Sequence, residues 1–552
     1  MSEPGQDQVG RATVIMAVGT VLSRATGFVR AAVIAATLGL ALTADMFAVA
    51  DAIPAAMYTI VAGGVLNAVL VPQLVRAMRR DADGGEAYAQ RLSSAVLLVL
   101  AVATALLVIG APWVIRLYTG AEYDTPQLQP QFDTIVLLAR FTLLQIFFYG
   151  LYTLLGQMLN ARGRFGPMMY APILNNVIAI AVFGGFLALM GPLDPQAGEF
   201  TTAEAAWFGL GSTVGIAAQA LVLLPVLWRS GLRLRLRTDL RGVGLGKAFR
   251  LGTWTVGLVA IMQVTQIVVI RLATSATAAA AADDAVERGA GIAVYNSAFL
   301  IIMVPHSIIT VSLATAMLPD LSRLAASSRL AQLRDQVMGA LRAAMAVIIP
   351  MSGLIVALAG PVSVLLFGYG AASGDTDLVA ATLLAFVPGL VGFTTTFMVQ
   401  RAFYAQEDTR TPVLVQAVVS VVQVALSLVL VTRLDPLFVS AGLAASWSVA
   451  ALVGSALGLA LLSRRVGRVH GGRFAGYLVV VAIAALPGSL LVLRGVLEYP
   501  AGSLGSSWGA LATVVLGSVV AAFVYVVLAW LMRIGPVRDG VSRVVVLARR
   551  HG

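Results

Sequence analysis

The sequence contains no cysteine, only three histidines and few charged residues for its length. Without cysteine the chain cannot form a disulfide framework, a zinc–thiolate site, an iron–sulfur cluster or a cysteine nucleophile. His306, His470 and His551 are too scattered to predict a histidine metal site. Only 11% of the 552 residues are charged, whereas a soluble chain of this length divides into several domains with charged surfaces. The composition excludes a soluble enzyme, a disordered scaffold and a collagen-like fibre.

Apolar residues dominate instead, at 59% of the chain. A hydrocarbon core about 30 Å thick is crossed by about 20 apolar helical residues, and fourteen stretches of the sequence meet this requirement. We therefore predict an all-α polytopic membrane protein with no metal site. The predicted spans are 12–37, 44–75, 92–110, 134–158, 168–190, 206–228, 252–272, 292–318, 340–366, 378–404, 412–432, 438–462, 474–493 and 508–532. The second is too long for one straight helix, and Pro54 and the Gly63–Gly64 pair are natural places for a bend.

The basic residues predict how the chain is threaded. With a cytoplasmic N-terminus, 29 of the 37 basic residues fall in cytoplasmic segments and four in outer ones, as the positive-inside rule requires. We therefore expect both termini in the cytoplasm. The net charge of +11 does not predict a nucleic-acid partner, because that interpretation needs a soluble basic face.

An internal repeat divides the chain into two halves. LNARGRFGPMMYAP (159–172) and FYAQEDTRTPVLV (403–415) each join two helices through a short polar turn with Arg, and each places Pro where the next helix begins. Six helices per half give both halves the same orientation, with an axis along the membrane normal, as in alternating-access transporters. The expected parts are an N-lobe (1–228), a basic linker (229–250), a C-lobe (251–463), two further helices (464–535) and a basic cytoplasmic tail (536–552). We expect the linker to be either an amphipathic segment on anionic headgroups or a plain solvated connection.

Arg24 is the strongest functional candidate within the spans, where ionisable side chains are costly. It lies about 18 Å into the first span, near the midplane. Gly19, Ser23 and Gly27 recur every four residues beside it and predict a packing face. Arg24 is therefore expected to face a cavity or, as the alternative, to form a structural ion pair.

The other intramembrane charges are more ambiguous. Arg30 is expected either to serve function or to pair with Asp51, while Arg140 and Arg271 are expected near the outer surface with their heads snorkelling. Facing the cavity is the alternative for Arg271. Four Arg against two Asp leave an excess of two positive charges in the spans, and guanidinium forks bind phosphate well. The excess favours a phosphate-bearing anion over an organic cation as cargo.

Several motifs resemble one transporter family. SRATGFVRAAVIAATLG (23–39) and ADMFAVADAIP…GGVLNAVLVPQLVRAM (44–78) are similar to the first two helices of the MurJ (MviN) family of lipid II flippases, especially its actinobacterial branch. GQMLNARGRFGPMMYAPILNNV (156–177) and RAFYAQEDTRTPV (401–413) resemble its half-repeat signatures. The similarity runs through the first twelve helices and places the chain in the MOP (MATE-like) exporter superfamily.

The resemblance implies two lobes of helices 1–6 and 7–12, with the last two helices forming a groove for an undecaprenyl tail. It also implies lipid II as the cargo, moved from the inner to the outer leaflet of the bacterial cytoplasmic membrane. Arg24 and Arg30 would hold the diphosphate. The substrate-binding residues expected from the family and from charge are Ser23, Arg24, Arg30, Asp45, Asn176 and Arg271.

Four features depart from the family pattern. Tyr58 and Leu300 stand where many members carry arginine, and Ala31 stands where an Asp often follows. The span 252–272 contains no Asp or Glu, although the sodium site of some members uses an acid on this helix. Arg271 could replace one lost charge by turning inward. We expect no cofactor and coupling to the membrane potential, with sodium coupling disfavoured.

Other functions remain as alternatives. A multidrug or other polysaccharide-lipid exporter of the same superfamily would explain the missing arginines. An enzyme is disfavoured, because no His, Cys or paired-carboxylate constellation lies near one membrane face. A scaffold for cell-wall synthesis proteins would use the Arg-rich segment 533–550 for docking, where a positive-inside anchor is the other interpretation. The expected partners are lipid II and membrane lipids, with the protein a monomer.

Overall fold

The computed structural model describes residues 6–60, 85–195, 198–232, 234–235, 237–239, 245–281, 290–498, 507–540 and 542. The regular elements in this part of the chain are all helices. Thirteen segments of the described chain are long and apolar enough to cross a membrane, and they coincide with thirteen of the fourteen predicted spans. The other predicted span, 44–75, begins as a helix at Leu42–Ile60, and its later residues, with the Gly63–Gly64 pair, lie outside the described residues. The all-α membrane fold is confirmed.

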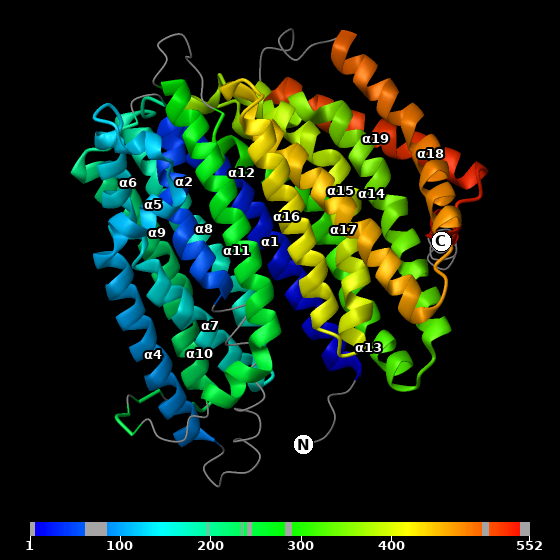
Figure 1. Ribbon diagram of the computed structural model, residues 1–552, viewed down its shortest axis with the longest axis horizontal. Helices are drawn as coiled ribbons and strands as arrows, with labels where there is room; N and C mark the ends of the chain where they lie inside the picture. Colours follow the sequence, from blue (N-terminus) through cyan, green and yellow to red (C-terminus); the bar gives the residue numbers. More distant parts are fainter. Residues whose placement is uncertain are drawn as a thin grey trace. The chain divides into compact units, whose positions relative to one another are not determined.

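Contacts divide the chain into two compact units (Figure 1). The first comprises Met1–Ala293 and Tyr369–Ala372. Its elements are α1 (Gln6–Leu38), α2 (Leu42–Ile60), α4 (Glu86–Ile109), α5 (Ala111–Tyr118), η2 (Ala121–Asp124), α6 (Gln129–Thr142), α7 (Gln145–Ala161), α8 (Gly166–Met190), α9 (Thr202–Leu221), α10 (Leu223–Arg229), α11 (Leu245–Ala281) and η4 (Gly370–Ala372).

The second unit comprises Val294–Gly368 and Ser373–Gly552. Its elements are α12 (Ile292–Pro305, whose first two residues belong to the first unit), η3 (His306–Thr310), α13 (Val311–Ala326), α14 (Leu330–Phe367), α15 (Thr376–Ala405), α16 (Arg410–Val431), η5 (Pro436–Phe438), α17 (Val439–Val466), α18 (Gly471–Glu498) and α19 (Ser507–Leu531). The division into lobes of helices 1–6 and 7–12 stays a prediction. In the structure, α11, the seventh predicted span, packs in the first unit.

Two helices differ from their predicted bounds in a way that moves a candidate residue. The seventh span is 37 residues long and continues to Ala281, so Arg271 lies well inside it and not at its end. The extension is alanine-rich, and alanine combines the best helix propensity with weak hydropathy, which a scan for apolar runs misses. The fourth span begins at Gln129 and is interrupted between Thr142 and Gln145, so Arg140 also lies inside a helix.

Proline produces a local change of helix type in the second unit. Pro305 ends α12 and is followed by the π-helical turn His306–Thr310. Proline donates no backbone hydrogen bond, which allows the ladder to shift at this point. Thr394 of α15 fixes the turn, because its Oγ1 lies 3.3 Å from His306 Nδ1 and 3.4 Å from Thr310 Oγ1.

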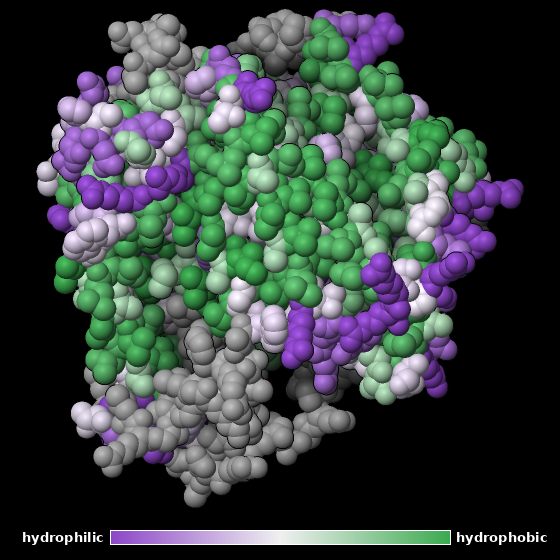
Figure 2. Space-filling model, in the orientation of Figure 1, coloured by the Kyte–Doolittle hydropathy of each residue, from purple (hydrophilic) through white to green (hydrophobic). Residues whose placement is uncertain are grey.

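The outer faces of the helices are apolar. Figure 2 shows hydrophobic residues over the mid-lengths of the helices in view and hydrophilic residues gathered at helix ends. On α19, Leu516, Val519 and Phe523 are each more than 60% exposed. Apolar patches this extensive are not found on soluble monomers. The chain is a multi-pass membrane protein.

Candidate functional site

Helices α1 and α8 pack side by side over most of their lengths. The missing side chain of Gly19 makes room for the ring of Tyr170, since a Cβ there would lie 2.9 Å from Tyr170 Cε2. Farther along both helices, Thr37 Oγ1 donates a hydrogen bond of 3.2 Å to the carbonyl of Phe183. Residue numbers rise together along the pair, so the two helices run in the same direction. The predicted packing face of the first helix is confirmed.

Asn176 joins α8 to the turn of α1 that carries Arg24. Its Nδ2 donates hydrogen bonds of 3.0 Å to the Ser23 carbonyl and of 3.0 Å to Thr26 Oγ1. The side chain is buried, with 8% of its surface exposed. The structure therefore brings Asn176 against Ser23, the residue before Arg24, and no described contact joins Asn176 to Arg24 itself. The contribution of Thr26 was not predicted, because a threonine in an apolar helix carries no distinguishing sequence signal.

Arg24 projects away from this packed face and is exposed. Among the described residues, no carboxylate lies within 4.0 Å of its guanidinium. A cation at this depth of a membrane-spanning helix is costly without a counter-ion. The positive charge of Arg24 is therefore not neutralised by any described carboxylate.

Arg30 lies six residues farther along α1 and has a partner. Its Nη2 is 4.0 Å from Asp51 Oδ2 of α2, with side chains 22% and 28% exposed. This confirms the predicted pair. Gln145, the first residue of α7, donates a hydrogen bond of 3.3 Å to Asp51 Oδ1. Asp51 thus compensates part of the charge of Arg30, whereas the charge of Arg24 remains.

Tyr58 occupies the position of the missing helix-2 arginine and makes an aromatic contact. Its ring centroid lies 4.8 Å from that of Tyr149 and 6.4 Å from that of Tyr152, both on α7. The side chain therefore packs α2 against α7. Among the described residues, this aromatic contact does not replace the positive charge that an arginine would supply at position 58.

Asp45 is fully buried and holds three segments of the first unit together. Its Oδ2 accepts a hydrogen bond of 2.5 Å from Thr277 Oγ1 on α11, and its Oδ1 accepts one of 2.7 Å from the backbone N–H of Ala293. Gly291 provides the space, because a Cβ there would lie 1.5 Å from Asp45 Oδ2. The predicted role of Asp45 at the cargo stays a prediction. Thr277 and Gly291 were not predicted, because their partner lies more than 230 positions away.

Arg271 is exposed on α11, and its Nη1 donates a hydrogen bond of 3.1 Å to the carbonyl of Arg116 at the end of α5. Two neighbours strengthen this contact. Thr274 Oγ1 lies 3.1 Å from the Tyr118 carbonyl, and Ser275 Oγ lies 3.1 Å from Glu122 Oε2. One face of α11 is therefore attached to the segment that follows α4. The use of Arg271 in the cargo site remains a prediction.

An apolar groove lies between α14, α18 and α19 in the second unit. Its volume is about 180 Å³. The hydroxyl of Tyr525 donates a hydrogen bond of 2.5 Å to the Ala346 carbonyl and so joins α19 to α14. The lining residues are Ala346, Val347, Pro350, Met351, Leu354, Ala485, Ser489, Ala521, Ala522, Tyr525 and Val526. Two of these helices, α18 and α19, are those that the resemblance implies to hold a lipid tail, and that assignment stays a prediction.

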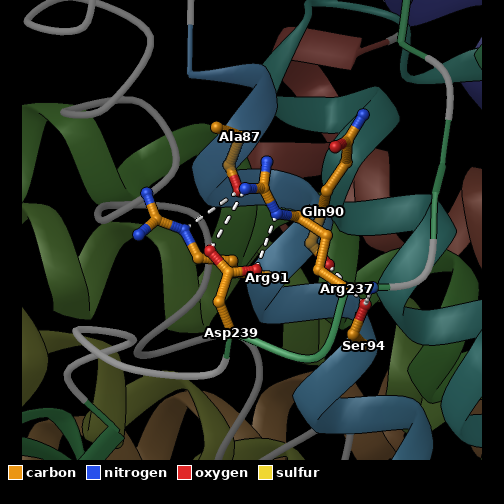
Figure 3. A network of polar contacts seen from close by, with 6 residues as sticks. All are labelled: Ala87, Gln90, Arg91, Ser94, Arg237 and Asp239. Atoms are coloured by element: carbon orange, nitrogen blue, oxygen red, sulfur yellow. Dashed lines mark hydrogen bonds and ion pairs between the residues drawn. The ribbon is translucent and has the colours of Figure 1, made fainter.

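Arg237 of the basic linker lies against α4 (Figure 3). The backbone N–H of Arg237 donates a hydrogen bond of 2.8 Å to Ser94 Oγ, and its guanidinium forms two bonds to Asp239. Leu232 is buried, whereas Arg235 is exposed. The backbone here is not helical. The choice between an amphipathic segment on headgroups and a plain solvated connection stays a prediction.

Comparison with known proteins agrees with this geometry. The family model described as lipid II flippase MurJ matches residues 34–529. A relative from Burkholderia cenocepacia, "Lipid II flippase MurJ", is 27% identical over 494 residues, which cover 87% of this chain and 88% of that protein.

Solved structures show the same fold. A structure of "Lipid II flippase MurJ, inward closed conformation" superposes with a TM-score of 0.70 at 17% identity, covering 96% of this chain and all of that one. An inward-facing multidrug resistance MATE transporter of the MOP superfamily gives 0.61 at 16% identity, covering 80% of this chain and 95% of that one. The fold is common to flippases and drug exporters, and the family match distinguishes between them. The chain belongs to the lipid II flippase MurJ family.

Proposed function

We propose that this protein moves lipid II from the inner to the outer leaflet of the bacterial cytoplasmic membrane by alternating access. The family match over residues 34–529 carries the proposal. The geometry adds an exposed arginine, Arg24, with no carboxylate partner among the described residues. A diphosphate is the kind of group that such a cation binds, through charge-assisted bonds to the guanidinium fork.

In this proposal Arg24 and Arg30 both bind the diphosphate. They are six residues apart, a rise of about 9 Å along the helix. Because Asp51 already lies beside Arg30, Arg24 is the principal anchor and Arg30 contributes the second contact. Arg271 would add a third charge when its bond to the Arg116 carbonyl breaks.

The hydrocarbon tail needs an apolar surface that stays open to lipid. The groove between α14, α18 and α19 is lined by alanines and other apolar residues and supports this assignment. In the proposed cycle the tail remains in lipid at this groove while the headgroup crosses between the lobes.

The membrane potential is the proposed driving force. An inside-negative potential favours outward movement of negative charge, by about 2.3 kcal/mol per charge for each 100 mV. A diphosphate carries its charges in that direction. The absence of Asp and Glu from 252–272 supports a cycle without sodium. We propose that the protein is a monomer and that both termini lie in the cytoplasm.

Translocation by the purified protein tests the proposal. Proteoliposomes would carry lipid II, and a membrane-impermeant enzyme that modifies the headgroup would report its arrival at the outer face. We expect transfer that accelerates under an inside-negative potential and is unchanged by sodium. Transfer at the rate of protein-free vesicles would contradict the proposal.

A multidrug exporter is the second candidate, favoured by Tyr58 and Leu300 in place of the usual cavity arginines. It predicts reduced drug susceptibility in an overexpressing strain. Drug resistance without lipid II transfer would favour that function.

A further inference from the structure

We propose that Asn176 is a positioning residue that acts through Arg24 and does not touch the cargo. Its amide fixes the turn of α1 from Ser23 to Gly27, and this turn carries Arg24. The inference rests on the proposed function and deepens it. It assigns Asn176 a different task from that of a substrate ligand.

The hydrogen-bonding capacity of the Asn176 amide is the first argument. An asparagine NH₂ group has two donors. Nδ2 has two acceptors at 3.0 Å, the Ser23 carbonyl and Thr26 Oγ1. Both donors are therefore in use, and only the Oδ1 acceptor remains, which would repel a phosphate oxygen. The side chain is also 8% exposed, which leaves little surface for a ligand.

The second argument is where the bonds end on α1. The Ser23 carbonyl belongs to the residue directly before Arg24, and Thr26 follows two residues later. Thr26 Oγ1 also lies 3.0 Å from the Leu22 carbonyl and 3.0 Å from the Ser23 carbonyl. Side-chain groups that enter a helix ladder alter its local geometry. Asn176 and Thr26 thus determine the direction in which this turn presents its neighbouring arginine.

The third argument concerns the space beside the turn. Gly27 carries no side chain, and a Cβ there would lie 3.7 Å from Asn176 Nδ2, at ordinary contact distance. The amide therefore lies beside Gly27 on the small-residue face of α1, while Arg24 is exposed on the same helix. One side of the turn is fixed by α8, and the other presents the guanidinium to an anion.

A double-mutant cycle tests this relationship. Lipid II binding would be measured with the purified full-length protein for the wild type, Arg24→Ala, Asn176→Ala and the double variant. We expect Asn176→Ala to weaken binding about tenfold, equivalent to about 1.4 kcal/mol. In the Arg24→Ala background the same change should have almost no further effect. Undecaprenyl diphosphate should show the same pattern, because it retains the diphosphate.

Matched controls separate positioning from general damage. Thr37→Val removes another α1–α8 hydrogen bond about 20 Å from Arg24, and it should leave lipid II affinity within about twofold of wild type. If Asn176→Ala does not fold, Thr26→Val replaces it in the cycle, because it removes one of the two acceptors of the amide.

The outcomes are distinguishable. Full additivity of Asn176→Ala and Arg24→Ala would overturn the inference and indicate an independent contact with the cargo. An equal loss of affinity in Thr37→Val would also overturn it. A wild-type protein that binds neither lipid II nor undecaprenyl diphosphate would instead contradict the proposed function itself.

Discussion

Asp45 Oδ2 lies 2.5 Å from Thr277 Oγ1, although the two residues are 232 positions apart in the chain. Both side chains are buried, with 0% and 2% of their surfaces exposed. A polar group removed from water is stable only where hydrogen bonds replace those to solvent. The carboxylate also receives the Ala293 N–H, so α2, α11 and the start of α12 depend on one another.

Removal of the Thr277 hydroxyl should destabilise the protein. Thr277→Val keeps the shape of the side chain but leaves the buried Asp45 carboxylate without one donor, at a cost of about 1–3 kcal/mol. Thermal unfolding in detergent would show a lower midpoint. The control is Thr265→Val on the same helix, whose hydroxyl, among the described residues, bonds to the Ile261 carbonyl of its own helix. A midpoint for Thr277→Val equal to that of the control would contradict the role of this bond.

Gly291 should tolerate no side chain. In Gly291→Ala the added Cβ would lie 1.5 Å from Asp45 Oδ2 and 2.1 Å from Thr277 Oγ1, so the three groups must separate. We expect a large loss of folded protein, measured by size-exclusion chromatography and thermal unfolding. Gly257→Ala on α11 is the control, because a Cβ there meets open space and alanine favours the helix. Equal yields of the two variants would refute this interpretation.

Arg24 should require its guanidinium and not only a positive charge. Arg24→Ala should abolish complementation of a strain depleted of its own flippase, at normal protein levels. Arg24→Lys should retain only part of the activity, because an ammonium lacks the bidentate fork. Arg30→Ala should be less severe, since Asp51 already offsets part of that charge. Full rescue by Arg24→Ala would show that Arg24 is not needed to bind the cargo.

Asp408, at the turn before α16, should make stability depend on pH. Burial alone would raise the pKa of Asp408, but hydrogen bonds from Thr411 and the charge of Arg465 lower it overall. A pKa that is lower in the folded state stabilises the protein above the unfolded value of about 4, and this stabilisation is lost as the pH falls through the folded value. Because Asp408 accepts hydrogen bonds from Arg410 and Thr411, Asp408→Ala should cost about 1 kcal/mol at pH 7 and progressively less below pH about 4.

Unfolding midpoints between pH 7 and pH 3 would measure this dependence. Asp435→Ala is the control, because it removes a cap hydrogen bond to the Leu437 N–H at an exposed position. A difference between Asp408→Ala and wild type that stays constant down to pH 3 would show that the carboxylate charge contributes nothing.

The groove of α14, α18 and α19 should determine affinity for the tail. Ala522 lines the groove and is exposed, so Ala522→Phe should fill much of it without disturbing the core. We expect weaker binding of lipid II. The affinity for a short-chain analogue that retains the diphosphate should not change. Ala512→Phe, nearer the start of α19, is the control for added bulk, because Ala512 is exposed and does not line this groove. Unchanged lipid II binding in Ala522→Phe would place the tail elsewhere.

The candidate site was only partly accessible from sequence. Arg24 and Arg30 were found because a charge inside an apolar run is conspicuous, and Asp51 because it enters the next span from the same side. Asn176 was named from the family motif alone. Thr26, Gln145, Thr277 and Gly291 were missed, because small polar residues and glycine occur throughout apolar helices for many reasons. Their importance depends on a partner that is distant in the chain.

The sequence by itself determined that the chain crosses a membrane repeatedly as helices, because the length and hydropathy of each span are local properties. It also determined where the few intramembrane charges fall. Only the tertiary structure decided which of these charges is compensated, because a counter-ion is defined by distance in space. That distance places Asp51 beside Arg30, buries Asp45 under Thr277 and Ala293, and leaves Arg24 exposed with no carboxylate partner among the described residues.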